Sequence, residues 1–110
     1  MDAVTDRVSL ELTSPIVLID GENVRRSAWP NVSRTDLVRL VEAWAGRQGL
    51  EARIYWESDE TADDAIAREA TSLDRYWLVS SDHGLRQRAG GRAERVIGGG
   101  AFLRQLRGGS

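Results

Sequence analysis

The sequence predicts an α/β fold in which a mostly parallel sheet of four strands is flanked by helices. Three observations support this prediction. Apolar runs typical of strands alternate with segments of helical periodicity, in the order βαβαβαβα. The connections between them are short, as they are where helices cross over between parallel strands. The 110 residues, 41% of them hydrophobic, are enough for one core, so we expect a single domain.

One strand and a long helix are predicted near the start of the chain. Residues 1–14 alternate only weakly between apolar and polar, so we expect a tail there, or a short edge strand that would be the fifth of the sheet. The first clear strand is 16–19, and a loop through Trp29-Pro30 leads to Ser33, a typical helix N-cap. The helix that follows repeats its apolar residues on one face and then meets two glycines: Leu37, Leu40, Val41 and Trp44, then Gly46 and Gly49.

The middle of the chain contains two further strands and a helix between them. A strand is predicted at 52–56 and another, rich in aromatic and β-branched residues, at 76–80. Thr61 is suited to cap the intervening helix. The stripe of that helix that faces inward consists of Ala62, Ile66, Ala70 and Leu73.

The last part of the chain adds two helices and a fourth strand. Ser81 or Asp82 caps a short helix that runs to Ala89 and is broken by Gly90-Gly91. Residues 95–97 form the fourth strand. Three consecutive glycines then open a final helix that buries Phe102, Leu103 and Leu106.

The composition excludes several classes of chemistry. The chain has no cysteine, which excludes disulfides and thiolate metal sites, so a metal would be held by oxygen atoms or by the one histidine. Oxygen ligands favour magnesium, manganese or calcium. All 15 basic residues are arginine, which excludes a P-loop and a Schiff-base enzyme. No apolar run approaches the about 18 residues of a membrane span, so we expect a cytoplasmic protein that is not bound to a membrane.

The net charge of −2 conceals an asymmetry along the chain. Residues 1–64 contain 13 acidic and 7 basic side chains, whereas residues 65–110 contain 4 acidic and 8 basic ones. We therefore expect the acidic cluster in the first half, and the arginines that would meet a polyanion in the second. An ordinary solvated surface explains the same arginines equally well.

Carboxylates follow each of the first three predicted strands. Asp20 ends the first, Glu60, Asp63 and Asp64 come after the second, and Asp82 follows the third. The carboxyl ends of parallel strands meet at one edge of the sheet, so we expect these groups to converge. Crowded carboxylates repel one another and raise each other's pKa, which a divalent cation would relieve. The pattern predicts a site for one or two magnesium or manganese ions.

Helical phase distinguishes the two adjacent aspartates. Asp63 lies next to the buried stripe of its helix and is the preferred ligand, whereas Asp64 is directed toward the open side. Asp64 serves equally well as a charge that complements the helix N-terminus. Glu60 is a further candidate, with an exposed loop acid as the alternative interpretation. Glu22 is not included in the cluster.

Other polar side chains near these strand ends are candidates for contacts with substrate. The Asn23 amide would orient Asp20 or a phosphate, and Ser80 and Ser81 would donate hydrogen bonds to a phosphate or to Asp82; turn residues of these types also occur for structural reasons alone. Candidate phosphate-binding arginines are Arg25, Arg26 and Arg86. A chemical role for the lone His83 is the weaker interpretation, and packing is the favoured role of Trp29 and Trp56, with base stacking as the alternative.

With these residues in view, the chain resembles the NYN domain of the PIN-like nuclease superfamily, in particular its bacterial branch typified by YacP-like proteins. The matching segments are 19–24 (IDGENV), 60–66 (ETADDAI), 78–85 (LVSSDHGL) and 98–103 (GGGAFL). The resemblance implies a three-layer, PIN-like α/β/α sandwich over 15–107, between a tail at 1–14 and a flexible end at 108–110. It also implies a metal-dependent ribonuclease, with Asp20, Asp63, Asp82 and Asn23 at the matched positions.

The function expected from the sequence is therefore a magnesium- or manganese-dependent endonuclease that acts on RNA. The segment 56–60 is shorter than in relatives, where a longer glycine-rich loop is common, and this leaves room for a second hypothesis. In that hypothesis the protein is an RNA-binding or regulatory module that keeps the fold without catalysis. A phosphohydrolase of small nucleotides is a third. RNA is the expected partner, and a homodimer or a partner protein is left open.

Overall fold

Four parallel strands form one sheet in the order β2-β1-β3-β4. The structure, a computed structural model, describes residues 14–108. The strands are β1 Ile16–Asp20, β2 Glu51–Tyr55, β3 Tyr76–Val79 and β4 Arg95–Ile97. The sequence-based prediction of a parallel four-stranded sheet is confirmed. The weak alternation in the first residues, which left a fifth strand open, lies outside the described residues.

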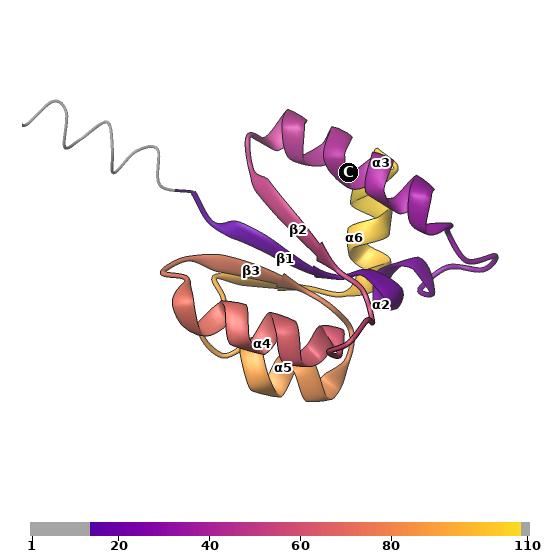
Figure 1. Cartoon of the computed structure of the whole chain (residues 1–110). Helices are drawn as coiled ribbons and strands as arrows, with labels where there is room; N and C mark the ends of the chain where they lie inside the picture. Colours follow the sequence, from indigo (N-terminus) through magenta and orange to yellow (C-terminus); the bar gives the residue numbers. More distant parts are fainter. Residues whose placement is uncertain (1–13, 109–110) are drawn as a thin grey trace, which may run out of the picture.

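Helices cover both faces of the sheet and make a three-layer sandwich (Figure 1). On one side lie α2, α3 and α6, and on the other α4 and α5. Their bounds are α2 Gly21–Arg25, α3 Arg34–Gln48, α4 Ala62–Ser72, α5 His83–Ala89 and α6 Gly99–Leu106. None of the helices within 14–108 is long and apolar enough to cross a membrane.

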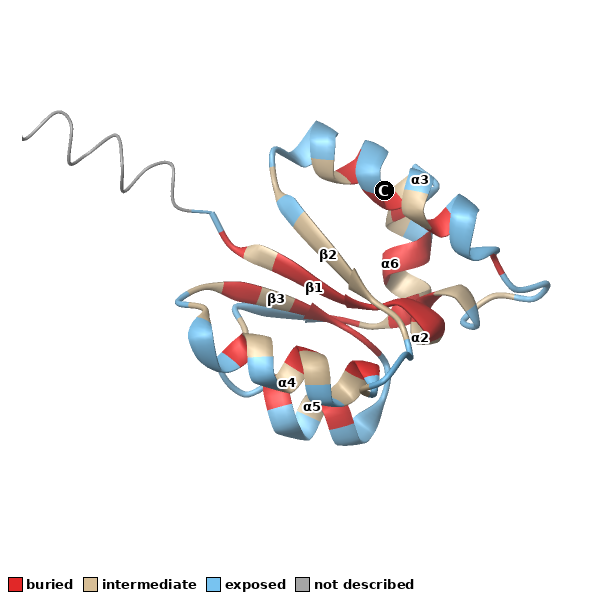
Figure 2. Ribbon diagram, in the orientation of Figure 1, coloured by how far each residue is buried: buried red, intermediate tan, exposed pale blue. Residues whose placement is uncertain are grey.

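The central strand β1 is buried on both faces, and its alternation assigns each residue to one layer (Figure 2). Val17 and Ile19 pack in the core under α3 and α6, where the rings of Trp44 and Phe102 meet edge to face with centroids 5.0 Å apart. Leu18 belongs to the other core, under α4 and α5. The same alternation continues to Asp20 and directs its side chain to the α4 and α5 side.

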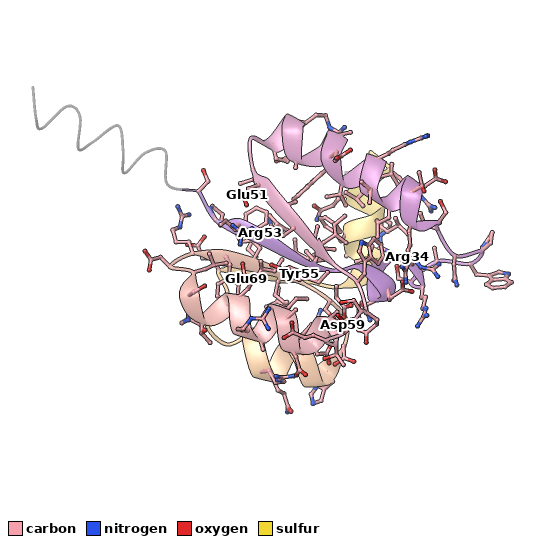
Figure 3. All side chains as sticks on the ribbon, viewed as in Figure 1. Arg34, Glu51, Arg53, Tyr55, Asp59 and Glu69 are labelled. Carbon is pink, nitrogen blue, oxygen red and sulfur yellow. The ribbon has the colours of Figure 1, made fainter. Side chains whose placement is uncertain are left out.

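The edge strand β2 is tied to α4 by charged residues rather than by apolar packing alone. The Arg53 guanidinium pairs with Glu51 on its own strand, at 2.8 Å, and with Glu69 of α4 (Figure 3). Charged side chains on an edge strand also discourage pairing with another chain. The pair with Glu69 joins the second half of α4 to the sheet.

The predicted helix caps are confirmed, and one alternative is settled. The Ser33 and Thr61 hydroxyls accept hydrogen bonds from the backbone N–H groups of Asp36 and Asp64, both at 3.1 Å. Asp82, and not Ser81, caps α5, because its carboxylate accepts from Leu85 N. Gly49 ends α3 in the left-handed conformation at φ 68°.

The structure differs from the prediction at residues 21–25, which were expected to be a turn and a loop. They form the short helix α2 directly after β1. Five residues are too few to show a helical period, and the glycine at the first position disfavours a helix. The glycine is required instead by packing, since a Cβ at Gly21 would lie 2.6 Å from the ring of Trp56 and 2.9 Å from Ile54 Cγ2. The contact with Ile54 and Trp56 therefore explains the glycine at the start of this helix.

This close approach predicts that Gly21→Ala destabilises the fold. The added methyl group has no space against Trp56, so the free energy of unfolding should fall by about 1–3 kcal/mol. Gly46→Ala in α3 is the matched control, because nothing lies within 4 Å of the Cβ it would add. The control should gain about 0.5–1 kcal/mol, as is usual for this change inside a helix. Urea unfolding of both variants measures the difference, and equal stability of the two would contradict the packing argument.

Candidate active site

The candidate site lies where the strand order reverses, at the carboxyl ends of β1 and β3. The connection from β1 leads to β2 on one side, whereas the connection from β3 leads to β4 on the other, which opens a crevice between β1 and β3 at this edge. An open pocket of about 490 Å³ occupies the crevice. Its lining residues are Asp20, Glu22, Asn23, Arg26, Ser27, Glu57, Asp63, Ser81 and Asp82.

Asp20 is the innermost of the three predicted carboxylates. It is 7% exposed, and its Oδ2 accepts a hydrogen bond of 3.0 Å from the hydroxyl of the fully buried Ser80. The same hydroxyl oxygen accepts from Asp82 N at 3.0 Å, which orients the Ser80 proton toward Asp20. Burial raises the pKa of Asp20 above its ordinary value, and the negative charges of Asp63 and Asp82 add to the rise, against opposing hydrogen bonds from Ser80 and the Asn23 backbone.

Asp63 and Asp82 reach the pocket from the starts of two helices. Asp63 lies in the first turn of α4, where burial and the charge of Asp82 raise its pKa, while Arg88 opposes the rise. Asp82 Oδ1 accepts from Leu85 N at 2.8 Å as the cap of α5. Asp82 therefore combines a structural contact with a charge directed at the site.

Asn23 ties the site to the start of α6. Its Oδ1 accepts from Ser81 N at 2.8 Å, and the Ser81 hydroxyl accepts from Gly99 N at 2.8 Å. A Cβ at Gly99 would lie 2.8 Å from Asn23 Oδ1, so the glycine allows this close approach. The oxygen is thus occupied, and the NH₂ group of Asn23 has no acceptor among residues 14–108.

Two of the predicted acidic residues are not among the lining residues. Glu60 pairs with Arg68, and the Asp64 carboxylate lies 2.9 Å from Arg88. Asp64 is exposed, whereas Asp63 is half-buried and lines the pocket. The structure thus separates the two aspartates along the helical phase used in the sequence argument. His83 is exposed and is also absent from the lining.

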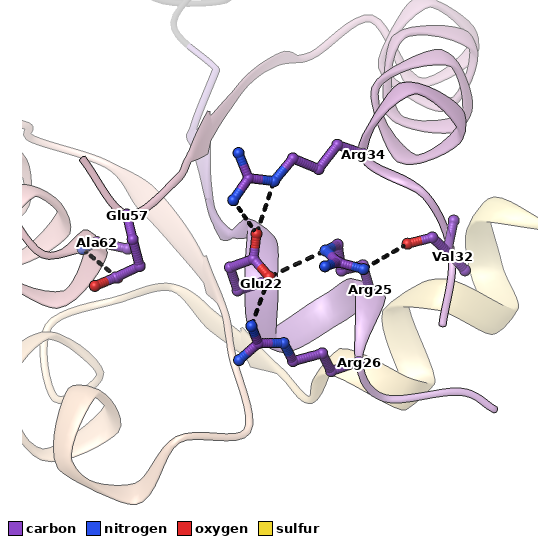
Figure 4. A network of polar contacts seen from close by, with 7 residues as sticks. All are labelled: Glu22, Arg25, Arg26, Val32, Arg34, Glu57 and Ala62. Carbon is purple, nitrogen blue, oxygen red and sulfur yellow. Dashed lines mark hydrogen bonds and ion pairs between the residues drawn. The ribbon is translucent and has the colours of Figure 1, made fainter. Parts of the chain in front are cut away.

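Glu22 is a buried carboxylate that is neutralised by three arginines (Figure 4). It is 7% exposed, and its oxygens lie 3.0 Å from Arg25, 3.2 Å from Arg26 and 2.7 Å from Arg34. Burial alone would raise the pKa of Glu22, but the hydrogen bond from Arg34 and the three positive charges outweigh it, so the pKa is lowered. Glu22 therefore adds little negative charge to the pocket.

The three predicted phosphate-binding arginines differ in how far they are engaged. Arg25 is held by Glu22 and by the Val32 carbonyl at 3.2 Å, and Arg86 Nε donates to the Ser80 carbonyl at 2.8 Å. Both therefore have structural contacts. Arg26 lines the pocket, and its side chain is 64% exposed in spite of its contact with Glu22. Of the three, Arg26 is the one with access to a ligand.

Glu57 and Ser27 line the pocket and were not identified from the sequence. The Glu57 carboxylate accepts from Ala62 N at 2.8 Å, and its charge raises the pKa of Asp63. The sequence did contain a signal for Glu57. It is the first acidic residue after the second predicted strand, just as Asp20 and Asp82 are the first acidic residues after the first and third predicted strands. Ser27 lies in the connection after α2, where no pattern indicated contact with the site.

The oxygen donors of the pocket are of the type that binds magnesium or manganese. Asp20, Asp63 and Asp82 all line it, yet no three His, Asp or Glu side chains in the described part of the chain are grouped closely enough to hold an ion between them. The residues therefore fit a site in which water or phosphate oxygens complete the shell. Mg²⁺ commonly binds in this way, through one or two carboxylates.

The fold is similar to that of a solved structure. The chain superimposes on the crystal structure of a mutant of Rae1 (YacP) from Bacillus subtilis with a TM-score of 0.68, over 86% of this chain and 76% of that one, at 20% sequence identity. No protein-family model matches the sequence, and the search of curated proteins finds no match. At this level of identity the likeness establishes a shared fold.

The raised pKa of Asp20 predicts that Asp20→Asn stabilises the protein. The folded state holds the Asp20 proton more tightly than the unfolded state, so the contribution of Asp20 to stability is largest below the unfolded pKa and is lost as the pH rises through the folded pKa. Removing the charge should raise the melting temperature at pH 7 in metal-free buffer, and the gain should vanish at acid pH. Thermal unfolding across pH 3–8 measures it, and a lower melting temperature at pH 7 would contradict the electrostatic argument.

Glu22→Gln provides the matched control, because Glu22 is equally buried and lies only two residues away. Its pKa is lowered, so its contribution is present above the unfolded pKa and is lost as the pH falls through the folded one. Loss of charge-assisted hydrogen bonds should cost about 2 kcal/mol at pH 7. The two substitutions should therefore shift stability in opposite directions.

Proposed function

We propose that the protein is a magnesium- or manganese-dependent ribonuclease that hydrolyses RNA phosphodiester bonds in the Asp20 pocket. The observation that supports this most is that Asp20, Asp63 and Asp82 line one open pocket, where two of them have raised pKa values. Repelling carboxylates in an open crevice are costly unless they serve a cation. The structural neighbour is named YacP, as is the bacterial branch that the sequence motifs resemble.

The three carboxylates would act around one ion in this proposal. Asp20, oriented by Ser80, and Asp63 would hold an ion, with Asp82 adding negative charge from the start of α5. When bound, such an ion lowers the pKa of a coordinated water and offsets negative charge on the phosphate.

The opposite wall of the pocket, formed by α2 and its continuation, would bind the substrate phosphate. The Asn23 NH₂ group is free to donate to a phosphate oxygen, and the exposed Arg26 guanidinium adds positive charge beside it. Because Glu22 already engages Arg26, the arginine is held near the pocket before substrate arrives. The carboxylates on one wall would hold the ion, and the hydrogen-bond donors on the other wall would hold the phosphate against it.

The second candidate function is an RNA-binding module that keeps the fold but not catalysis. The observation in its favour is that the described acidic residues do not form a complete cage for an ion. In this case RNA would bind in a salt-dependent manner, and added metal would not lead to cleavage.

Cleavage of labelled single-stranded RNA in the presence of Mn²⁺ tests the proposal. The native chain should cut, and Asp20→Asn should cut more than about 100-fold more slowly, because the residue would contact the ion directly and even loss of an outer-shell partner costs about 10–100-fold. Ser80→Ala should show that smaller loss, since Ser80 only orients Asp20. Failure of the native protein to cut any RNA while still binding it would favour the module instead.

Two substitutions of Asp82 separate its cap from its charge. Asp82→Asn keeps a good capping residue and removes a charge that repels Asp20 and Asp63, so it should be at least as stable as the native protein, yet cleavage should fall. Asp82→Ala also loses the cap and should be less stable by about 1 kcal/mol. Circular dichroism melts and the cleavage assay measure the two effects. Full activity of Asp82→Asn would exclude Asp82 from the site.

A further inference from the structure

Charge is divided between the two helical layers as well as between the two halves of the chain. The segments 21–48 and 98–108, which form α2, α3, α6 and the connections around them, contain seven arginines and three acidic residues. The segments 57–75 and 82–94, which contain α4 and α5, have nine acidic residues and five arginines. One layer is therefore basic and the other acidic, and the candidate site lies between them.

The arginines of the two layers also differ in their partners. On the acidic layer, Arg68, Arg75 and Arg88 are paired with Glu60, Glu94 and Asp64. On the basic layer, four exposed arginines form no ion pair within the described part of the chain: Arg39, Arg47, Arg104 and Arg107. Their charge is available to a ligand, and a polyanion would be attracted to this layer and repelled by the other.

The connection between α2 and α3 carries an exposed aromatic residue on this basic side. Trp29 is 90% exposed, on a segment that extends from the body of the domain (Figure 1). It lies two residues after Ser27, which lines the Asp20 pocket. A tryptophan left in water at this position gains nothing for the core, but its faces are free to stack.

A second groove continues from this connection on the side away from the carboxylates. It measures about 550 Å³ and is lined by Pro30, Asn31, Val32, Ser33, Asp36, Arg39, Leu40 and Arg107. Two arginines against one aspartate make it basic. Ser27 and Pro30 are three residues apart, so at most about 11 Å of extended chain separates the linings of the two cavities.

We propose that the α2–α3 connection and this groove form a binding surface for single-stranded RNA, with one unpaired base stacked on Trp29 and the adjoining phosphates held by Arg39 and Arg107. The inference rests on the proposed function and extends it. Unpaired arginines interleaved with an exposed aromatic ring are the features that bind single strands without regard to sequence. The strand would enter the Asp20 pocket across α2, away from the acidic layer. Duplex RNA would not present an unstacked base to Trp29.

Binding of a fluorescently labelled single-stranded RNA 12-mer to the Asp20→Asn protein, without divalent metal, tests the stacking contact. In this background Trp29→Ala should weaken binding by about 5- to 150-fold, the usual range for loss of one stacked base. Trp29→Phe keeps an aromatic face and should retain most of the affinity. Equal binding by the alanine variant, or no binding by the parent, would overturn the proposal.

Charge-matched substitutions test the path of the strand. Arg39→Gln and Arg107→Gln should each reduce the slope of log affinity against log salt by about 0.7, the value for one contact with a single strand. Arg68→Gln removes the same charge from an exposed position on the acidic layer and should leave the slope unchanged. Equal effects of all three would indicate a response to net charge alone and would overturn the path.

The design separates this inference from the proposed catalysis. If the native chain cuts no RNA but Trp29→Ala weakens binding, the nuclease assignment fails and the binding surface stands. If the native chain cuts and Trp29→Ala leaves both the affinity and the KM unchanged, the binding surface fails alone.

Discussion

The burial of the Asp20 carboxylate at the end of the central strand is the constraint on which the rest of the site depends. A charge at a position 7% exposed is costly, and the fold meets this cost only in part, through the Ser80 hydroxyl and the Asn23 backbone. Ser80 in turn accepts from Asp82 N, and Asp82 caps α5. One chain of hydrogen bonds thus joins the ends of β1 and β3 to the start of α5, and leaves Asp20 with a raised pKa.

Asp20 and Glu22 show how two buried acids in one segment can have opposite roles. Glu22 is surrounded by Arg25, Arg26 and Arg34, and its lowered pKa indicates a carboxylate whose charge stabilises the fold. Asp20 has other carboxylates as its charged neighbours. The fold neutralises Glu22 but leaves the charge of Asp20 unfavourable. At such a position a ligand is expected to supply the missing positive charge.

Because charge is divided between the two helical layers, the site has an acidic side and a basic side. The carboxylates Asp63 and Asp82 come from the acidic layer, whereas Asn23, Arg26 and Ser27 come from the basic one, so the pocket combines both. A polyanion approaching from the α3 and α6 side meets arginines that have no partner within the described chain. If the net charge of −2 were spread evenly over the surface, the protein would repel a polyanion. The exposed Trp29 lies on this side of the pocket, where a strand would arrive.

The sequence alone determined the elements other than α2 and the sheet edge at which the acids lie, because both follow from local regularities. The period of apolar residues located the strands and the long helices, capping residues such as Ser33 and Thr61 marked where helices begin, and parallel strands must end at one edge. Helical phase was also enough to prefer Asp63 to Asp64. These signals need only neighbours a few residues away.

Only the tertiary structure decided which polar groups remain free. Gly21 at the start of α2 packs on Trp56, Glu22 is neutralised by Arg34 from another helix, and Glu60 is engaged by Arg68. Glu57 enters the pocket in its place. The arginines sort by layer, since Arg39 on α3 and Arg107 after α6 are far apart in the sequence but line one groove. The packing of Gly21 on Trp56 and the shared groove of Arg39 and Arg107 join residues distant along the chain, and no local pattern encodes such partners.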